Sequence, residues 1–335
     1  MVSGDVLTLS GDDVRVLLDG REQEILAAAA SAYKAHGTGQ SSLPHSLFLR
    51  FPADERNRII ALPAYLGDGF GIAGMKWISS FPANLEKGLS RASAVIILNS
   101  AQTGRPQAIM EGSVVSAKRT AASAALAASR LTARPPQAVG IIGCGPINLE
   151  VTRFLLAVWP ELRRLYIFDV DAERAQQFKQ KCEQLNVEVE VAPELTAALR
   201  EAELISFATT AATPHVFSLS QCIPGSTILH VSLRDLSPEV ILSSDNVVDD
   251  VAHVCRWQTS IHLAEQLTGN TDFIRCTLAE VLEGTAAPKK DPQALTVFSP
   301  FGLGVLDLAV AQLAMELASE DSRGTLLKDF LPASN

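Results

Sequence analysis

Residues 139–148 have the sequence VGIIGCGPIN, and this stretch decides the fold of the chain. An apolar strand-forming segment runs directly into a glycine-rich turn, and Pro146 then opens a second apolar segment at a position where a helix tolerates proline. In such a unit Gly143 permits the tight turn, and Gly145 lets the backbone approach a pyrophosphate at the helix N-terminus. The stretch therefore predicts a dinucleotide-binding turn. A purely structural turn in another doubly wound domain is the alternative.

The segment after the turn supports the cofactor prediction. The next predicted strand, LYIFD, ends at Asp169. An acidic residue there receives the ribose hydroxyls of NAD and repels the extra phosphate of NADP, so we expect NAD. Asn148 stands where a third small residue is usual, which departs from the fingerprint. We assign Pro146 and Ile147 to the cofactor turn together with the two glycines.

Strands and helices alternate regularly from residue 138 onward, which predicts βαβ crossovers and a parallel sheet. A long Ala/Ser-rich helix over residues 111–131 precedes this region and ends at Pro135-Pro136. The fold class is therefore α/β, with a Rossmann-like NAD domain over residues 131–304. We expect residues 1–130 and 305–335 to form an α+β substrate-binding and dimerisation domain, which begins with one helix over residues 10–36 and recruits an apolar C-terminal helix.

Composition excludes several classes of function. Lys and Arg total 28 against 37 for Asp and Glu, a net charge of −9, which argues against nucleic acid and anionic membranes as partners. Five cysteines without a C-x-x-C pair indicate a reducing cytoplasm and no zinc site. The N-terminus shows no signal-peptide pattern, and the histidines show no metal-ligand spacing. No nucleophile elbow or phosphate-binding P-loop occurs, which disfavours serine hydrolases and P-loop NTPases.

Three charged residues stand where charge is unusual. Arg119 lies among Ala and Ser on a predicted helix, where its guanidinium suits a substrate carboxylate; alternatively it lies on an exposed stripe or pairs with Glu111. Lys76 interrupts a predicted buried strand, unless that strand is an edge with an outward-facing lysine. Asp235 follows a predicted parallel strand, at the edge where such sheets bind ligands; alternatively it is the N-cap of a helix starting near Ser237.

Together these segments resemble the ornithine cyclodeaminase/μ-crystallin family over nearly the whole chain. The matching segments are Ile60-Ala61-Leu62-Pro63, Met75-Lys76-Trp77, Met110-Glu111, Arg119-Thr120-Ala121, Gly143-Cys144-Gly145, Asp235, and Ser299-Pro300-Phe301-Gly302 with Asp307. Within the family, Leu49-Arg50, Lys76-Trp77-Ile78, the stretch 91–99 and the stretch 141–145 are most similar to the branch that makes 2,3-diaminopropionate for siderophores and peptide antibiotics. The glutamate of the ornithine cyclodeaminase Glu-Leu-Met-Pro pattern is absent, which argues against ornithine cyclisation.

The resemblance implies an NAD-dependent dehydrogenase that cleaves N-(2-amino-2-carboxyethyl)-L-glutamate to 2,3-diaminopropionate and 2-oxoglutarate. The substrate would come from a partner PLP-dependent synthase, and family members are commonly homodimers through the first domain. Two alternatives use the same scaffold for catalysis: an ornithine or lysine cyclodeaminase, and a ketimine or imine reductase. A third alternative is a non-catalytic, μ-crystallin-like ligand-binding protein.

The resemblance also assigns roles to individual residues. Arg119, Lys76 and Arg50 match carboxylate-binding positions, and we add Arg91 for a third carboxylate. Asp235 matches the catalytic aspartate, with Lys76 as the second catalytic candidate. The remaining cofactor contacts that the resemblance implies are Thr120 at a phosphate, and Thr209, Ser232 and Gly302.

Overall fold

A computed structural model describes residues 4–54 and 56–332. Contacts divide the chain into two units, residues 1–119 with 303–335 (unit 1) and residues 120–302 (unit 2). The division falls inside helix α3 (Ser113–Leu131), whereas the boundary expected after residue 130 lies at the C-terminal end of that helix.

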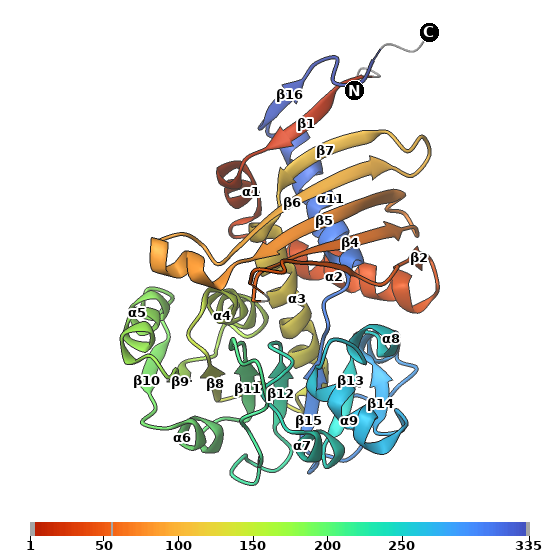
Figure 1. Ribbon diagram of the computed structural model, residues 1–335. Helices are drawn as coiled ribbons and strands as arrows, with labels where there is room; N and C mark the ends of the chain where they lie inside the picture. The colour runs from red at the N-terminus through yellow and green to blue at the C-terminus, as the bar shows by residue number, and fades with distance from the viewer. Residues whose placement is uncertain (1–3, 55, 333–335) are drawn as a thin grey trace. The chain divides into compact units, whose positions relative to one another are not determined.

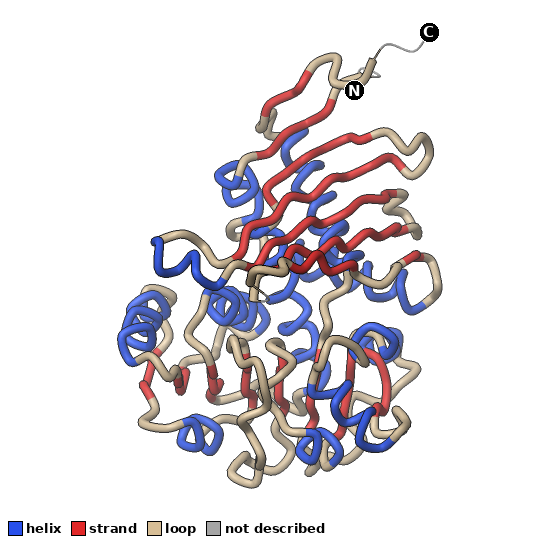
Figure 2. The backbone as a smooth tube through the Cα atoms, in the orientation of Figure 1, coloured by secondary structure: helices blue, strands red, loops and turns tan. Residues whose placement is uncertain are grey.

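Unit 1 contains an antiparallel-rich sheet with helices on one face (Figures 1 and 2). Its strands are β1 (Val6–Leu9), β2 (Ser41–Ser42), β3 (Leu47–Arg50), β4 (Arg58–Leu66), β5 (Ile72–Ser80), β6 (Ala92–Ser100), β7 (Pro106–Glu111) and β16 (Thr325–Leu327). Its helices are α1 (Gly11–Leu18), α2 (Glu22–Gly37), the 3₁₀ turn Pro82–Lys87, the first part of α3, and α11 (Gly304–Glu320).

The sheet order in unit 1 is β16-β1-β7-β6-β5-β4-β2, with β3 also paired to β4. The C-terminal helix α11 packs against β4, β5, β6 and α2, as expected from its apolar sequence. Because successive strand residues face opposite sides, Lys76 and Ser80 of β5 share one face of the sheet, and Trp77 lies on the other.

The expected single helix over residues 10–36 is wrong at one point. α1 and α2 are separate, and Gly20 between them has φ +75°, a conformation that a right-handed helix cannot include. The predicted start of α1 is confirmed: Ser10 and Asp13 form a reciprocal capping box.

Unit 2 is built from parallel strands and their crossover helices. The strands are β8 (Ala138–Ile142), β9 (Arg164–Phe168), β10 (Glu188–Val191), β11 (Leu204–Phe207), β12 (Thr227–His230), β13 (Asp245–Val248), β14 (Ile274–Thr277) and β15 (Thr296–Ser299). The helices are α4 (Pro146–Val158), α5 (Ala172–Glu183), α6 (Leu195–Arg200), α7 (Pro238–Leu242), α8 (Val251–Val254), α9 (Ser260–Thr268) and α10 (Leu278–Glu283).

The strand order in unit 2 is β10-β9-β8-β11-β12-β15-β13-β14, and every described pair in it is parallel. The chain moves from β8 toward β9 and β10 on one side, and through β11 and β12 on the other. Parallel sheets of this kind bind ligands where the strand order reverses, at the carboxyl ends of the strands. Here that point lies between β8 and β11. The predicted α/β architecture with a parallel sheet is confirmed.

Within the described residues, no helix is long and apolar enough to cross a bilayer.

Candidate functional site

A buried ion cluster occupies the helix-covered face of the unit 1 sheet. The Lys76 side chain, only 2% exposed, lies 2.9 Å and 2.8 Å from the two carboxylate oxygens of Asp307, which is fully buried on α11. Lys76 Nζ also donates to Ser116 Oγ at 3.0 Å, and Arg119 Nε donates to Asp307 Oδ1 at 2.9 Å. Two cations thus share one carboxylate, which leaves net positive charge in a buried place. A bound anion is the natural complement of that charge.

The cluster decides between the interpretations left open for its members. Lys76 is buried rather than an outward-facing edge lysine, and Arg119 is buried rather than part of an exposed stripe. Arg119 does not pair with Glu111, because the Glu111 carboxylate accepts from the backbone N–H groups of Ser113 and Val114 and thereby caps α3.

The pKa of Lys76 is lower than that of an ordinary lysine. Burial is the largest cause that lowers the pKa of Lys76, the positive Arg119 lowers it further, and Asp307 opposes both, which leaves a value of about 8. Because the unfolded chain holds this proton more tightly, the contribution of Lys76 to the free energy of unfolding rises between pH 8 and its ordinary pKa. Near pH 7 the lysine is charged and able to hold a carboxylate.

Further cations lie on the same face, toward the end of β5. Arg50 pairs in register with Arg58, and Arg58 pairs with Ser80, so these residues share a side of the sheet with Lys76. Arg91 Nη1 donates to Ser80 Oγ at 3.0 Å, and burial lowers the pKa of Arg91 from its ordinary value. We call Arg50, Arg58, Ser80 and Arg91 the arginine end of this face.

In unit 2, the glycine turn has the geometry that a dinucleotide requires. Gly143 has φ +91°, and a Cβ there would lie 2.6 Å from Ala208 O, so only glycine lets the end of β8 approach the end of β11. A Cβ on Gly145 would meet nothing within 4 Å, and no side chain caps α4 at Gly145, although Ser, Thr or Asp is usual at such a position. Because Pro146 has no N–H, the donors that the first turn of α4 leaves for an anion begin at Ile147.

Asp169 lies at the same edge, directly after β9. Its Oδ2 accepts from the backbone N–H of Cys144 at 2.8 Å, and its Oδ1 accepts from that of Asp171 at 2.9 Å. Arg174 Nη1 lies 3.6 Å from Oδ1. The carboxylate is therefore fixed against the turn, at the position where an acidic residue suits ribose hydroxyls. The residues of this edge fit NAD.

Asn148 braces the turn where the fingerprint usually has a small residue. Its Nδ2 donates to the carbonyls of Ile142 at 3.0 Å and Gly143 at 2.7 Å, and its Oδ1 accepts from Ser206 Oγ at 2.7 Å. The side chain is fully buried. The Asn148 amide thus joins the end of β8, the turn and β11. Its hydrogen bonds hold helix and strands close together, which a third glycine would achieve by its small size.

We expect Asn148→Ala to raise the KM for NAD⁺ about tenfold, because two carbonyls at the turn lose their donor, while kcat falls less. Initial-rate kinetics and dye-monitored melting measure the effect, with Asn270→Ala in an exposed loop of unit 2 as the matched control. In the double variant with Ser206→Ala, the two effects are expected to be smaller than their sum, since both remove one network. An unchanged KM for NAD⁺ would contradict the bracing role.

Asp235 lies in a second polar cluster at the carboxyl edge of unit 2. It is fully buried, its Oδ1 accepts from Thr209 Oγ1, and its Oδ2 accepts from Ser232 Oγ. Burial alone raises the pKa of Asp235, but His230 and the two hydroxyls outweigh burial and lower the pKa to about 2. The N-cap alternative is wrong, because Ser237 caps α7 by accepting from the Val240 N–H. Asp235 is a permanent anion at this edge.

The other residues expected to contact the cofactor differ in their surroundings. Thr209 and Ser232 lie at the edge but donate their hydroxyl protons to Asp235. The Gly302 N–H donates to Asp249 Oδ2 at 2.7 Å, so this backbone donor is already engaged. Thr120 follows Arg119 on α3 and is half-buried.

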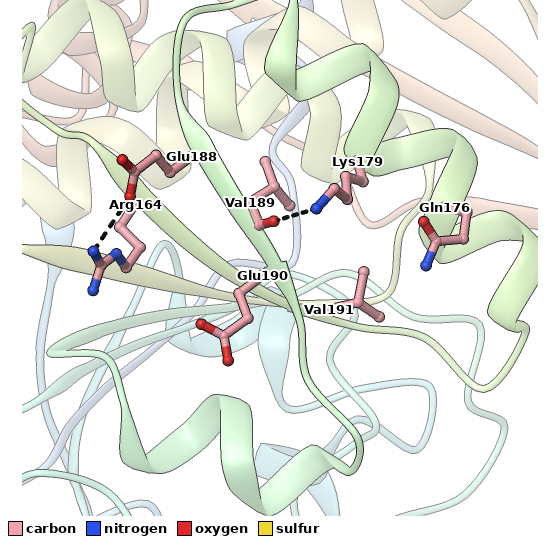
Figure 3. Close-up of a pocket in the computed structure, with 7 residues that line it drawn as sticks. All are labelled: Arg164, Gln176, Lys179, Glu188, Val189, Glu190 and Val191. Atoms are coloured by element: carbon pink, nitrogen blue, oxygen red, sulfur yellow. Dashed lines mark hydrogen bonds and ion pairs between the residues drawn. The ribbon is translucent and has the colours of Figure 1, made fainter.

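A surface pocket elsewhere on unit 2 is formed by β9, β10 and α5 (Figure 3). Lys179 Nζ donates to Val189 O at 2.9 Å, and Arg164 pairs with Glu188 at 3.3 Å. Arg164 and Glu188 begin their strands, so this pair lies away from the carboxyl ends of the strands. We place no step of a reaction there.

Sequence reasoning missed several residues of these clusters. The sequence motif alone gives Asp307 no role, yet a lone carboxylate in the apolar segment GVLDLAVAQLA is itself a signal of a buried partner cation. Arg58 was missed because only strand register brings it beside Arg50. Nothing in the sequence pattern indicated that Asn148 braces the turn. No group of three or more potential metal-ligating side chains occurs among the described residues.

Comparisons with known proteins give one consistent family. A family model described as "Ornithine cyclodeaminase/mu-crystallin family" matches residues 13–322. The chain is 27% identical over 331 residues to the N-((2S)-2-amino-2-carboxyethyl)-L-glutamate dehydrogenase of Staphylococcus aureus, which covers 96% of this chain and 98% of that protein.

Two solved structures are similar over nearly the whole chain. The Delta(1)-pyrroline-2-carboxylate reductase of Thermococcus litoralis, in complex with NADH and L-proline, has a TM-score of 0.89 at 26% identity and covers 96% of this chain and 99% of that chain. An archaeal alanine dehydrogenase dimer with bound NAD has a TM-score of 0.87 at 27% identity, with coverages of 97% and 99%. The three relatives act on different compounds at nearly equal identity, so identity alone does not select a substrate.

Proposed function

The chain belongs to the ornithine cyclodeaminase/mu-crystallin family, and from that premise we propose that it oxidatively cleaves N-(2-amino-2-carboxyethyl)-L-glutamate to 2,3-diaminopropionate and 2-oxoglutarate. It is an NAD-dependent oxidoreductase of amino-acid substrates, in keeping with its relatives. The proposal concerns the substrate and the residues that act on it. In it, unit 1 holds the carboxylates and the edge of unit 2 holds the cofactor.

The observation that carries the substrate assignment is the number of cations on one face of the unit 1 sheet. Lys76 and Arg119 suffice for the single carboxylate of alanine or proline. The arginine end adds Arg50, Arg58 and Arg91 on the same side. A substrate with three carboxylates uses this excess, because charge-assisted hydrogen bonds to arginine are strong and geometrically selective. Because the whole chain has a net charge of −9, a local positive cluster is unusual in it and supports an anionic substrate.

The chemistry requires oxidation at a carbon–nitrogen bond followed by hydrolysis. Bound NAD⁺ supplies the hydride acceptor. Lys76 and Arg119 hold the carboxylate next to the glutamate α-carbon and so fix that carbon for hydride loss. The fixed anion of Asp235 stabilises positive charge that develops on the nitrogen. Water then adds to the imine, and the carbon–nitrogen bond breaks to release the amine and the oxo acid.

The proposal is tested with a substrate panel followed at the NADH absorbance. The panel contains N-(2-amino-2-carboxyethyl)-L-glutamate, L-alanine, L-proline, L-ornithine and L-lysine. We expect equimolar NADH and 2-oxoglutarate from the first compound alone. Ammonia without net NADH would indicate a cyclodeaminase, NAD⁺-dependent turnover of proline would indicate a cyclic imine reductase, and no turnover would indicate a binding protein. Each of these outcomes would overturn the proposal.

Variants of the arginine end sharpen the same test. We expect Arg58→Gln and Arg91→Gln each to raise the KM for the tricarboxylate about tenfold to a hundredfold, because each removes a charge-assisted hydrogen bond. Arg15→Gln, on the exposed surface of α1, is the matched control. A KM that stays at the wild-type value in both variants would remove the arginine end from the substrate site.

Substrate affinity is expected to depend on pH through Lys76. Since the pKa of Lys76 is about 8, the KM for the anionic substrate rises as the pH increases through that value, because the neutral amine no longer attracts a carboxylate. The KM for NAD⁺ serves as an internal control and is expected not to rise over the same pH range. A flat KM for the substrate between about pH 7 and 9 would contradict the assignment of Lys76.

We also propose that the protein is a homodimer through unit 1. The sheet face opposite Lys76 carries three exposed apolar side chains, Leu47, Trp77 and Val95. Trp77 pairs in register with Val95, and the buried Ala61 pairs with both Leu47 and Trp77. Such a patch marks an interaction surface, and the related archaeal alanine dehydrogenase is a dimer. Light scattering should give twice the mass of the chain, and Trp77→Glu should give monomers. A monomeric wild type would refute this assignment.

Two further proposals concern the cellular setting. All five cysteines are free, and burial raises the pKa of each thiol, to about 12 for Cys144, Cys182 and Cys222. Free and unreactive thiols support a reducing cytoplasm. The substrate itself requires a preceding enzyme that joins a serine-derived carbon skeleton to glutamate, which fits a PLP-dependent synthase as the partner in the reaction sequence.

A further inference from the structure

His215 stands beside Asp235 at the carboxyl edge of the unit 2 sheet. Its backbone N–H donates to Asp235 O at 2.9 Å, and the next N–H, of Val216, donates to the same oxygen at 2.8 Å. These two hydrogen bonds fix the backbone of His215, from which its side chain extends. The imidazole Nε2 lies 3.9 Å from Asp235 Oδ1, and the His215 side chain is 43% exposed whereas the Asp235 side chain is fully buried. An exposed imidazole is therefore held next to a buried anion.

This place in the sheet is where the reactive end of a dinucleotide is expected. The glycine turn after β8 and Asp169 after β9 lie on one side of the switch point. A dinucleotide that spans the switch point has its other half over the ends of β11 and β12. His215 belongs to the loop that follows β11, and Asp235 to the loop that follows β12.

Asp235 cannot itself carry protons to the substrate. Both of its carboxylate oxygens already accept hydroxyl protons, one from Thr209 and one from Ser232, and the group has no exposed surface. A pKa of about 2 for Asp235 also makes it too weak a base near neutral pH. The reaction proposed above nevertheless moves protons at two points, when water adds and when the amine leaves.

We propose that His215 is a catalytic residue that carries these protons, with Asp235 as its fixed anionic partner; this rests on the proposed function. After hydride loss from the α-carbon, the substrate is an iminium ion. Water bonds to that carbon, and His215 takes one proton from it. His215 then gives this proton to the nitrogen, the carbon–nitrogen bond breaks with its electron pair on nitrogen, and the remaining hydroxyl proton leaves as the carbonyl forms. The balance is one water consumed and one proton released for each hydride transferred.

The surroundings of His215 suit this role. Asp235 is the ionisable side chain that the structure pairs with the His215 imidazole. The same carboxylate also faces the buried His230, whose Nε2 lies 3.4 Å from Oδ2, and the Thr209 and Ser232 hydroxyls. Arg234, beside Asp235 in sequence, donates instead to the Trp257 carbonyl at 2.7 Å. Solvent contact lets the imidazole of His215 exchange protons.

A matched control is available in the same unit. His262 on α9 is also partly exposed, and its partners are Gln258 N–H and Gln266. Neither partner belongs to the cofactor edge. His215→Gln and His262→Gln therefore make the same chemical change inside and outside the proposed site.

The test compares kcat/KM of the wild type and both variants from about pH 5.5 to 9, using whichever substrate of the panel the wild type turns over. We expect His215→Gln to lose about a hundredfold or more in kcat/KM, to lose the acidic limb of the profile, and to regain activity in imidazole buffer. His262→Gln should match the wild type. Oxidation of alanine also ends in hydrolysis of an imine, so a preference for alanine would refute the substrate assignment without deciding the role of His215. Turnover of proline, ornithine or lysine, whose cyclic imines are not hydrolysed, would overturn both proposals.

A second measurement does not depend on turnover. Diethylpyrocarbonate should modify both histidines in the free protein, and NAD⁺ with 2-oxoglutarate should protect His215 but leave His262 reactive, as read by peptide mass spectrometry. A His215→Gln variant that keeps wild-type kcat/KM and the acidic limb overturns the proposal. So does a His215 that is modified equally fast with and without the ligands.

Discussion

Asp307→Asn is expected to lower the free energy of unfolding by about 3–5 kcal/mol, because it leaves buried cations without their anion. Lys76 and Arg119 both donate to this carboxylate, and the Lys76 side chain is almost completely buried. An asparagine keeps the shape of the side chain but turns an N–H₂ group or a neutral oxygen toward two positive groups. The lysine then sheds its proton, and carboxylate binding is expected to fail as well.

Urea unfolding followed by circular dichroism measures the stability change, and the substrate panel measures the activity. Asp321→Asn, at the exposed C-terminal end of the same helix, is the matched control and should change the free energy of unfolding by less than about 0.5 kcal/mol. The double variant Lys76→Met/Asp307→Leu should recover part of the lost stability, since it removes a charge together with its partner, but no activity.

The double variant separates electrostatics from packing. If Asp307→Asn and the double variant unfold at the same urea concentration, the loss comes from disturbed packing of α11 rather than from unpaired charge. If Asp307→Asn is as stable as the control, the ion cluster makes no net contribution, and our reading of the buried charges is wrong.

Much of the fold follows from local sequence pattern. The strand–turn–helix at 138–158 and the strand–helix alternation after it are strong signals, because periodicity, glycine and proline all agree there. The Ser10 capping box and Ser237 at the start of α7 obey equally local rules. The missed break at Gly20 has a local signal too, since no apolar residue stands between Leu18 and Ile25 and Asp19-Gly20 is a turn-forming pair.

The site follows from sequence less completely, because its geometry depends on register and burial. The charges at Lys76 and Arg119 were recognisable as odd residues in apolar surroundings. Their common partner, Asp307, is 231 positions away from Lys76, and only the packing of α11 on the sheet shows the contact. In the same way, two strand pairings are needed to place Arg58 between Arg50 and Ser80.

The family resemblance predicts that Asp235 is a catalytic aspartate, a role that includes taking a proton from the amine or positioning the water. In the structure, His230 and the hydroxyls of Thr209 and Ser232 outweigh the effect of burial and keep Asp235 negatively charged. An anion of this kind acts by electrostatic preorganisation, since it favours the positive nitrogen of the reacting substrate without changing its own protonation.

Asp235→Asn is therefore expected to lower kcat about a hundredfold to ten-thousandfold while NAD⁺ binding stays near the wild-type value. The side chain keeps its volume and can still accept one hydroxyl, but it no longer offers negative charge to His215 or to the substrate nitrogen. The cofactor turn is held by other residues, Asp169 and Asn148, so the affinity for NAD⁺ should change little.

Stopped-flow and steady-state NADH formation measure the loss, and quenching of tryptophan fluorescence by NADH measures cofactor binding. Asp272→Asn, on an exposed loop of unit 2, is the matched control. Because the defect is one of charge, the pH profile of the variant should remain low across the whole range rather than shift. Wild-type turnover in Asp235→Asn would remove Asp235 from the mechanism, and with it the reason for placing a proton-carrying imidazole beside it.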